Sequence, residues 1–140
     1  MKAISTTLQR HTQGNNEIQN ITDDLQRIVR ESGVRTGQLA AMVIGSTASL
    51  STIEFEPGLV QHDIAAALEK LAPQNGRYEH ENTWQDDNGH SHVRACLVGP
   101  SLTLPVVDGA IPLGTWQQAV LIDFDTRSRT RQIAVTIVGE

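Results

Sequence analysis

The first half of the chain alternates short β-type patterns with longer helical ones. Residues 4–12 have period-two character with branched and threonine side chains, which predicts a strand. The turn-forming residues at 13–16 lead into a second short strand through Ile18, so we expect a hairpin there. Another strand is expected at 39–44, where a continuous apolar run indicates a buried position.

Two segments have the apolar spacing of amphipathic helices. The first begins at Thr22, a candidate capping residue, and carries Asp23 and Asp24 in its first turn. Gly33 marks its end, as is common just past the last helical turn. The second helix is expected at 57–72, with a proline near its first position and another proline closing it.

The second half of the chain is rich in β-type patterns separated by turn residues. Strands are expected at 77–81, 92–98, 102–107, 115–124 and 130–138. Connections this short join antiparallel strands. The sequence therefore predicts a single α+β domain over residues 1–140, in which two antiparallel sheets pack as a sandwich with two helices on one side.

Composition narrows the class of protein further. The chain has 140 residues and a formal net charge of −5, and its 11 Lys and Arg residues form no basic stripe, which argues against nucleic acid as a partner. No apolar run approaches the roughly 18 residues of a membrane span. The one cysteine, Cys96, excludes an intrachain disulfide and is expected to be a buried small hydrophobe, so a cytoplasmic location is expected.

Histidines gather in one segment of the chain. His80, His90 and His92 lie within residues 80–92, together with several carboxylates. In an extended segment, residues two apart point to the same side, so His90 and His92 would face one cation, with His80 arriving from the preceding strand. Zinc suits three imidazoles, and nearby carboxylates would orient the rings. The alternative is a polar loop with solvated histidines.

A long motif follows this segment. Residues 101–117 read SLTLPVVDGAIPLGTWQ and resemble at every fixed position the signature of the YjbQ family, also called the secondary thiamine-phosphate synthase family. Segments at 17–22, 78–80, 87–92, 97–101 and 129–131, and Gly139, agree with the same pattern. The resemblance covers nearly the whole chain. It implies an α+β homotrimer, a metal site, and thiamine-phosphate synthase activity in some members.

The candidate catalytic residues are His92, Gln117 and Asp87. The candidate substrate-binding residues are Ser101, Thr115, Trp116, Gln117, Asn88, Arg129 and Arg131. A primary amide such as that of Gln117 can fix a heterocycle or an anion, and a pair of arginines on one side of an extended chain suits phosphate, although solvated turn arginines are as common. Trp116 also begins an even-spaced apolar row, which favours a packing role for its indole.

One position departs from the family pattern. Where many members carry a histidine followed by Thr-Thr-Ala, this chain has Gly45 followed by Ser-Thr-Ala. If that histidine is a ligand in relatives, His90 is the nearest candidate replacement. The alternative is that Gly45 serves the backbone, by supplying a conformation that a side chain would hinder.

The leading functional hypothesis is an enzyme that acts on small phosphorylated molecules with the help of a divalent cation. The resemblance implies a reaction like that of thiamine-phosphate synthase, which joins a pyrimidine methyl pyrophosphate to a thiazole phosphate and releases pyrophosphate. Two alternatives remain open. One is a metal-dependent hydrolase with Asp86 or Asp87 as base, and the other is a non-enzymatic trimer that binds a metal or ligand.

Overall fold

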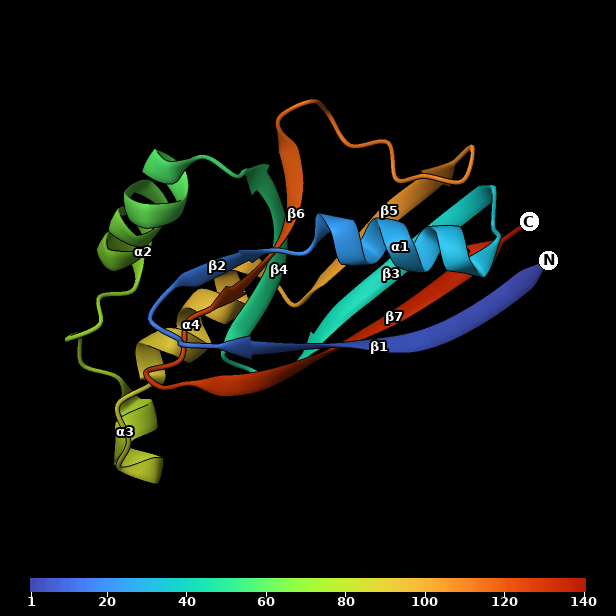
Figure 1. Cartoon of the computed structure of the whole chain (residues 1–140). Helices are drawn as coiled ribbons and strands as arrows, with labels where there is room; N and C mark the ends of the chain where they lie inside the picture. The colour runs from blue at the N-terminus through green and yellow to red at the C-terminus, as the bar shows by residue number, and fades with distance from the viewer.

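The computed structural model describes all 140 residues and contains two antiparallel sheets (Figure 1). The larger sheet has the strand order β1-β7-β3-β5 and the smaller sheet the order β2-β6-β4. The strands are β1 (Lys2–Thr12), β2 (Glu17–Asn20), β3 (Thr36–Ile44), β4 (Ala48–Glu54), β5 (Ser101–Val107), β6 (Gln117–Asp123) and β7 (Arg129–Gly139). The α+β class with two antiparallel sheets is thus confirmed.

Short helices fill the connections between the strands. They are α1 (Thr22–Ser32), a π-helical turn η1 (Leu59–Asp63) that continues into α2 (Ile64–Leu71), α3 (Glu79–Trp84) and α4 (Gly89–Val98). The longest of them has 11 residues. None has both the length and the apolar character that crossing a membrane requires.

The main core lies where the larger sheet meets α1 and one face of the smaller sheet. Strand β3 shows how the pattern works, because Leu39, Ala41 and Val43 are buried while the residues between them face outward. The apolar run at 39–44 is therefore buried on one face only, contrary to our expectation. Its outward side chains Met42 and Ile44 leave an apolar surface on the larger sheet.

A second, smaller core covers the other face of the β2-β6-β4 sheet. Val120, Ile122 and Phe124 of the β6 segment pack with Leu68 of α2 and Ala95 of α4. Because β6 also contributes Ala119 and Leu121 to the main core, both of its faces are buried. This explains why residues 119–124 read as a continuous apolar stretch apart from Asp123.

Several sequence expectations about secondary structure are wrong. Residues 77–81 and 92–98 are not strands, since they belong largely to α3 and α4. Strand β4 was not expected at all, because its residues 48–54 include three serines and threonines among few large apolar side chains. Both errors concern short segments in which tertiary packing outweighs local propensity.

The expected hairpin at residues 4–18 also does not form. β1 pairs with β7 of the larger sheet, whereas β2 pairs with β6 of the smaller one. Gly14, Asn15 and Asn16 all have positive φ, and the Asn15 backbone N–H donates to the Asp125 carbonyl oxygen (2.7 Å). The turn therefore carries the chain from one sheet to the other.

Helix α1 begins and ends where the sequence indicates, but its cap differs. Thr22 is the first helical residue rather than the cap, and its hydroxyl accepts a hydrogen bond from the Ala119 N–H (2.9 Å). Gly33 adopts the expected left-handed conformation with φ of 72°. Thr22 thus ties the start of the helix to β6 instead of closing the helix on itself.

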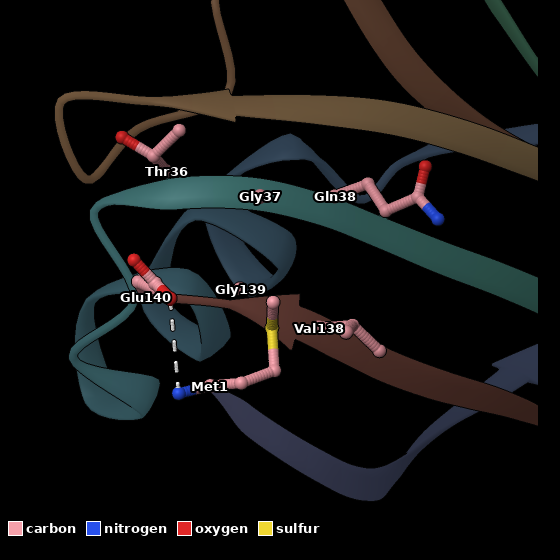
Figure 2. Close-up of a pocket in the computed structure, with 7 residues that line it drawn as sticks. All are labelled: Met1, Thr36, Gly37, Gln38, Val138, Gly139 and Glu140. Carbon is pink, nitrogen blue, oxygen red and sulfur yellow. Dashed lines mark ion pairs between the residues drawn. The ribbon is translucent and has the colours of Figure 1, made fainter.

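Two glycines allow β3 and β7 to approach closely beside the chain termini. A Cβ atom on Gly37 would collide with the backbone of Val138 and Gly139, and one on Gly139 would collide with Thr36 and Gly37. Figure 2 shows this region, where a hollow of about 550 Å³ lies between the ends of these strands and Met1. Gly37 and Gly139 are partners in this antiparallel strand pair, and neither position has room for a side chain.

The first prediction follows from this contact. Gly37→Ala should lower the free energy of unfolding by about 1 to 3 kcal/mol, because the added methyl group meets backbone atoms that cannot rotate away. Gly114→Ala is the matched control, since its Cβ would meet only Gln117 at an ordinary 3.7 Å. Urea unfolding of both variants measures the difference, and equal stability would contradict the proposed strand contact.

Candidate functional site

Three of the candidate residues lie on α3 and α4, beside the end of β6 where the smaller sheet meets the β6–β7 turn (Figure 1). His80 of α3 and His92 of α4 bring their rings to a centroid distance of 4.4 Å. His90 does not join them. Residues two apart on a helix are separated by about 200° around its axis, so the same-side argument made for a strand does not apply.

His90 instead points into the protein. Its side chain is only 2% exposed, its ring lies 6.5 Å from that of Tyr78, and its Nδ1 is buried without a hydrogen-bond partner. Burial lowers the pKa of His90, and the positive charge of Arg94 lowers it further. His90 is therefore neutral at pH 7 and contacts a different part of the structure from His92.

Two carboxylates lie close to His80 and form a group of potential metal ligands with it. His80 Nδ1 lies 3.0 Å from Asp86 Oδ1 and 3.7 Å from Glu81 Oε1, and one ligand atom from each residue lies within 4.8 Å of the others. Despite these distances, Nδ1 is buried and makes no hydrogen bond of acceptable geometry. Here a ring nitrogen and carboxylate oxygens converge without hydrogen bonds between them. A cation bound among these atoms would be coordinated by all of them.

The second imidazole at this site is suited to the same role. Burial lowers the pKa of His92, as does the neighbouring His80, although Asp125, Asp86 and the Ser46 backbone act in the opposite direction. The net effect keeps His92 in the neutral form at pH 7. Neutral imidazole is the form that binds a metal ion or accepts a proton.

Asp125 connects this group to the protein interior. Its side chain is fully buried, and burial alone would raise its pKa. Hydrogen bonds from the Thr126 N–H, the Thr47 hydroxyl, Arg129 and Asn88 outweigh that effect and lower the pKa to about 2. The Asp125 carboxyl group is therefore ionised at neutral pH.

Asn88 lies between Asp125 and the histidine group. Its amide nitrogen is 3.4 Å from Asp125 Oδ1, and with the amide turned over the nitrogen donates to both oxygens of Asp86, at 3.1 and 3.2 Å. Asp87, the next candidate, is exposed and accepts a hydrogen bond from the Thr126 hydroxyl (3.0 Å). The segment 86–88 is thus held against the β6–β7 turn.

The arginine pair expected to bind phosphate is engaged within the chain. Arg131 Nε and Nη2 donate to the two oxygens of Asp123 at 2.7 and 2.9 Å, and both side chains are almost completely buried. Arg129 donates to Asp125 (3.0 Å). The two arginines lie on one side of β7, as expected, but carboxylates already neutralise their charge.

The remaining substrate-binding candidates lie elsewhere. Thr115, Trp116 and Gln117 are at the start of β6, about 20 Å of strand away from Asp123 at its end. Trp116 is 73% exposed, so the expectation that it packs in the core is wrong. The Gln117 amide donates to Thr52 Oγ1 and accepts from the Gly114 N–H. Ser101 is exposed at the start of β5.

Gly45 and Cys96 share a small hollow with His92, of about 280 Å³. Gly45 has φ of 126°, and a Cβ atom there would lie 2.8 Å from Arg131 Nη1, which supports the interpretation that this glycine serves the backbone. Cys96 is exposed, contrary to the buried position that its apolar surroundings in sequence indicated. Its segment is a helix, so that only one side of it is covered.

Comparison with known proteins gives the family. Residues 6–140 match the family described as UPF0047 protein YjbQ-like. The chain belongs to the UPF0047 family. It is 34% identical over 140 residues to a UPF0047 protein of Methanothermobacter thermautotrophicus, a match that covers 100% of this chain and 95% of the relative. It is also 34% identical to the UPF0047 protein YjbQ of Escherichia coli O157:H7, over 86% of this chain and 87% of that one.

Solved structures of family members have the same fold. A YbjQ-like protein of unknown function from Sulfolobus solfataricus superposes with a TM-score of 0.88 at 30% identity, over 99% of this chain and 100% of that one. A YjbQ/UPF0047 protein from Clostridium acetobutylicum gives a TM-score of 0.83 at 31% identity, over 96% and 99% of the two chains. These matches extend the family assignment from sequence to three-dimensional structure.

Sequence reasoning missed two central residues of this UPF0047 domain. Asp123 and Asp125 are spaced two apart at the end of an apolar strand, and Arg129 and Arg131 are spaced two apart at the start of the next one. Two acidic residues with the same spacing as two arginines on the other side of a short turn were the sequence signal that could have predicted this ion-pair network. The carboxylates of this segment were expected to orient the histidine rings, and Asp86 also to act as a base in the hydrolase alternative, whereas the structure brings oxygens of Glu81 and Asp86 to His80 directly.

The second prediction concerns the ion pair of this network. Arg131→Met should lower the free energy of unfolding by about 3 to 5 kcal/mol, because Asp123 would remain buried without its guanidinium partner. Arg127→Met is the control, since Arg127 is exposed in the same turn and belongs to no ion pair. Denaturant unfolding measures both variants, and an Arg131→Met protein as stable as the control would show that the pair does not support the fold.

Proposed function

We propose that this UPF0047 protein is a metal-dependent enzyme that acts on a small phosphorylated molecule. The observation that carries the proposal is the buried His80 Nδ1, which lies 3.0 Å from one carboxylate oxygen and 3.7 Å from another yet makes no hydrogen bond. A divalent cation bound between these atoms would satisfy all three ligands. One imidazole and two carboxylates suit zinc, with manganese as a related possibility.

Because the nearby arginines are already paired with carboxylates, a bound cation is the favoured partner for a substrate phosphate. Arg129 and Arg131 are paired with buried carboxylates and offer little free positive charge to an anion. A bound cation would supply that charge and would polarise a phosphoryl oxygen. His92, whose ring lies against His80, would be the neutral base or a further ligand, and the exposed Asp87 would orient a water molecule or a substrate donor.

The reaction that we favour is of the thiamine-phosphate synthase type, in which pyrophosphate leaves as two heterocyclic substrates are joined. The resemblance of residues 101–117 to the YjbQ signature supports this choice. Stabilisation of the departing pyrophosphate is the chemical task that the His80 group would perform. Hydrolysis of a phosphorylated substrate is the second candidate, favoured by the exposed Asp87, which follows Asp86 of this group directly in the chain.

The third prediction tests the metal site. His80→Ala should weaken zinc binding at least about tenfold, because it removes the nitrogen around which the two carboxylates gather. His62→Ala is the matched control, since that histidine is exposed and its ring pairs with Asp63, outside the proposed site. Calorimetric titration of zinc into metal-free protein measures both affinities. Equal affinities in folded variants would remove His80 from the proposed site.

Turnover assays on the same proteins separate the functional candidates. A synthase should form product only when both the pyrophosphate and the thiazole phosphate substrates are present, and it should stop when a chelator removes the metal. A hydrolase should release phosphate from a single substrate. If the metal only joins subunits, chelation should dissociate the assembly and neither reaction should be observed.

We also propose that the protein assembles as a homotrimer, as its resemblance to the YjbQ family implies. The outer face of the larger sheet supports assembly with a second copy, because no helix covers it and it exposes Met42, Ile44, Val107 and Val138. Near the termini this face continues into the hollow shown in Figure 2. An uncovered apolar sheet face of this kind is a common subunit contact.

The fourth prediction follows from that face. Light scattering should report three times the chain mass of 15.3 kDa at micromolar concentration. Ile44→Lys should shift the mass toward the monomer, because it places a charge in the apolar surface. Val93→Lys, on an exposed position of α4, should leave the mass unchanged. A monomeric wild-type protein would refute the assembly.

A further inference from the structure

A groove at the far end of the smaller sheet is lined by aromatic and acidic side chains. It lies where β4 ends and β6 begins, at the top of the molecule in Figure 1, and its volume is about 390 Å³. It is lined by Phe55, Trp116, Glu54, Glu56, Gln118 and Asn20, among others. This volume lies within the range of small-molecule sites.

The two aromatic residues of the groove lie just beyond the paired part of the smaller sheet. Glu54 of β4 pairs with Gln117 of β6 as the last pair of the ladder, and Phe55 and Trp116 are the next residues outward on the two chains, where both line the groove. Phe55 is 41% exposed and Trp116 is 73% exposed. The aromatic ring pairs that make contact in this chain are Tyr78 with His90 and His80 with His92, so Phe55 and Trp116 do not stack on each other.

The charge of the groove has one sign. Glu54 and Glu56 line it, and no Lys, Arg or His does. Glu56 accepts hydrogen bonds from the N–H groups of Gly58 and Leu59, at 2.7 and 3.0 Å, which hold its carboxylate in place. Glu54 is exposed and makes no ion pair, so its carboxylate remains available to an occupant of opposite charge.

We propose that this groove binds a small organic cation of the ammonium class. The indole of Trp116 would receive the cationic head on its face, because the face of an aromatic ring is electron-rich and Trp is the strongest such partner. Glu54 would supply the opposing charge, and Phe55 would cover the apolar part of the ligand. Phosphates and other anions are disfavoured by the two carboxylates.

This site is independent of the proposed enzymatic site. About 20 Å of strand β6 separates Trp116 from the end of the strand near His80 and His92. Loss of the metal group should therefore leave cation binding unchanged, and loss of the groove should leave zinc affinity unchanged. The His80→Ala variant accordingly serves as a control for the groove.

Choline and its neutral isostere 3,3-dimethyl-1-butanol provide a matched pair of probes. Titration of the full chain, followed by NMR through the backbone amide signals of Phe55 and Gln118, should show saturable shifts with choline and much smaller shifts with the isostere. Trp116→Leu should raise the dissociation constant for choline about fivefold to tenfold. Glu54→Gln should raise it about twofold to fivefold, and added salt should weaken binding to the wild-type protein.

Trp84→Leu is the control variant, because Trp84 is the other tryptophan, is 71% exposed and lies on α3 away from the groove. It should bind choline as the wild-type protein does. Equal shifts with the neutral isostere would overturn the proposal in favour of a merely apolar patch. Absence of choline binding to the wild-type protein would overturn the proposal, and a change of oligomeric mass in Trp116→Leu would then assign the groove to a subunit contact.

Discussion

The buried ion pair between Asp123 and Arg131 is the interaction on which the arrangement of this domain depends. It joins the end of β6 in the smaller sheet to the start of β7 in the larger one, and the Thr12 hydroxyl of β1 donates to the same carboxylate. Two charges removed from water cost several kcal/mol each unless they are fully bonded. Here both oxygens of Asp123 have partners, so the pair fixes how the two sheets meet.

Hydrogen bonds connect the neighbourhood of this ion pair to the candidate site. Asp125, two residues further along, binds Arg129 and Thr47, and through Asn88 it reaches the segment that carries Asp86. His80 and His92 lie on two short helices that pack beside this segment. The group of potential ligands, which is partly buried, is therefore supported by a hydrogen-bonded network of buried residues, and such support is the condition under which a metal or substrate site keeps its geometry.

Sequence patterns predicted the parts of the structure in which local and tertiary preferences agree. Helix α1 has acidic residues at its start and Gly33 at its end, and strands β5 and β7 have clear alternation, so these elements were found. Helix α4 was mistaken for a strand because residues 93–98 are apolar apart from Arg94 and include two valines, whereas in the structure Ala95 and Val98 pack against the smaller sheet from a helix. That error also misplaced His90, since a helix separates two residues that a strand would align.

The central claim is that His80, Glu81 and Asp86 form a cation site supported by the buried ion pairs. X-ray diffraction from zinc-soaked crystals, recorded on both sides of the zinc absorption edge, locates bound zinc by its anomalous signal. The account predicts an ion about 2.0 to 2.2 Å from His80 Nδ1 and from a carboxylate oxygen of Asp86. A fully occupied zinc ion bound elsewhere on the protein, with none at His80, would contradict it.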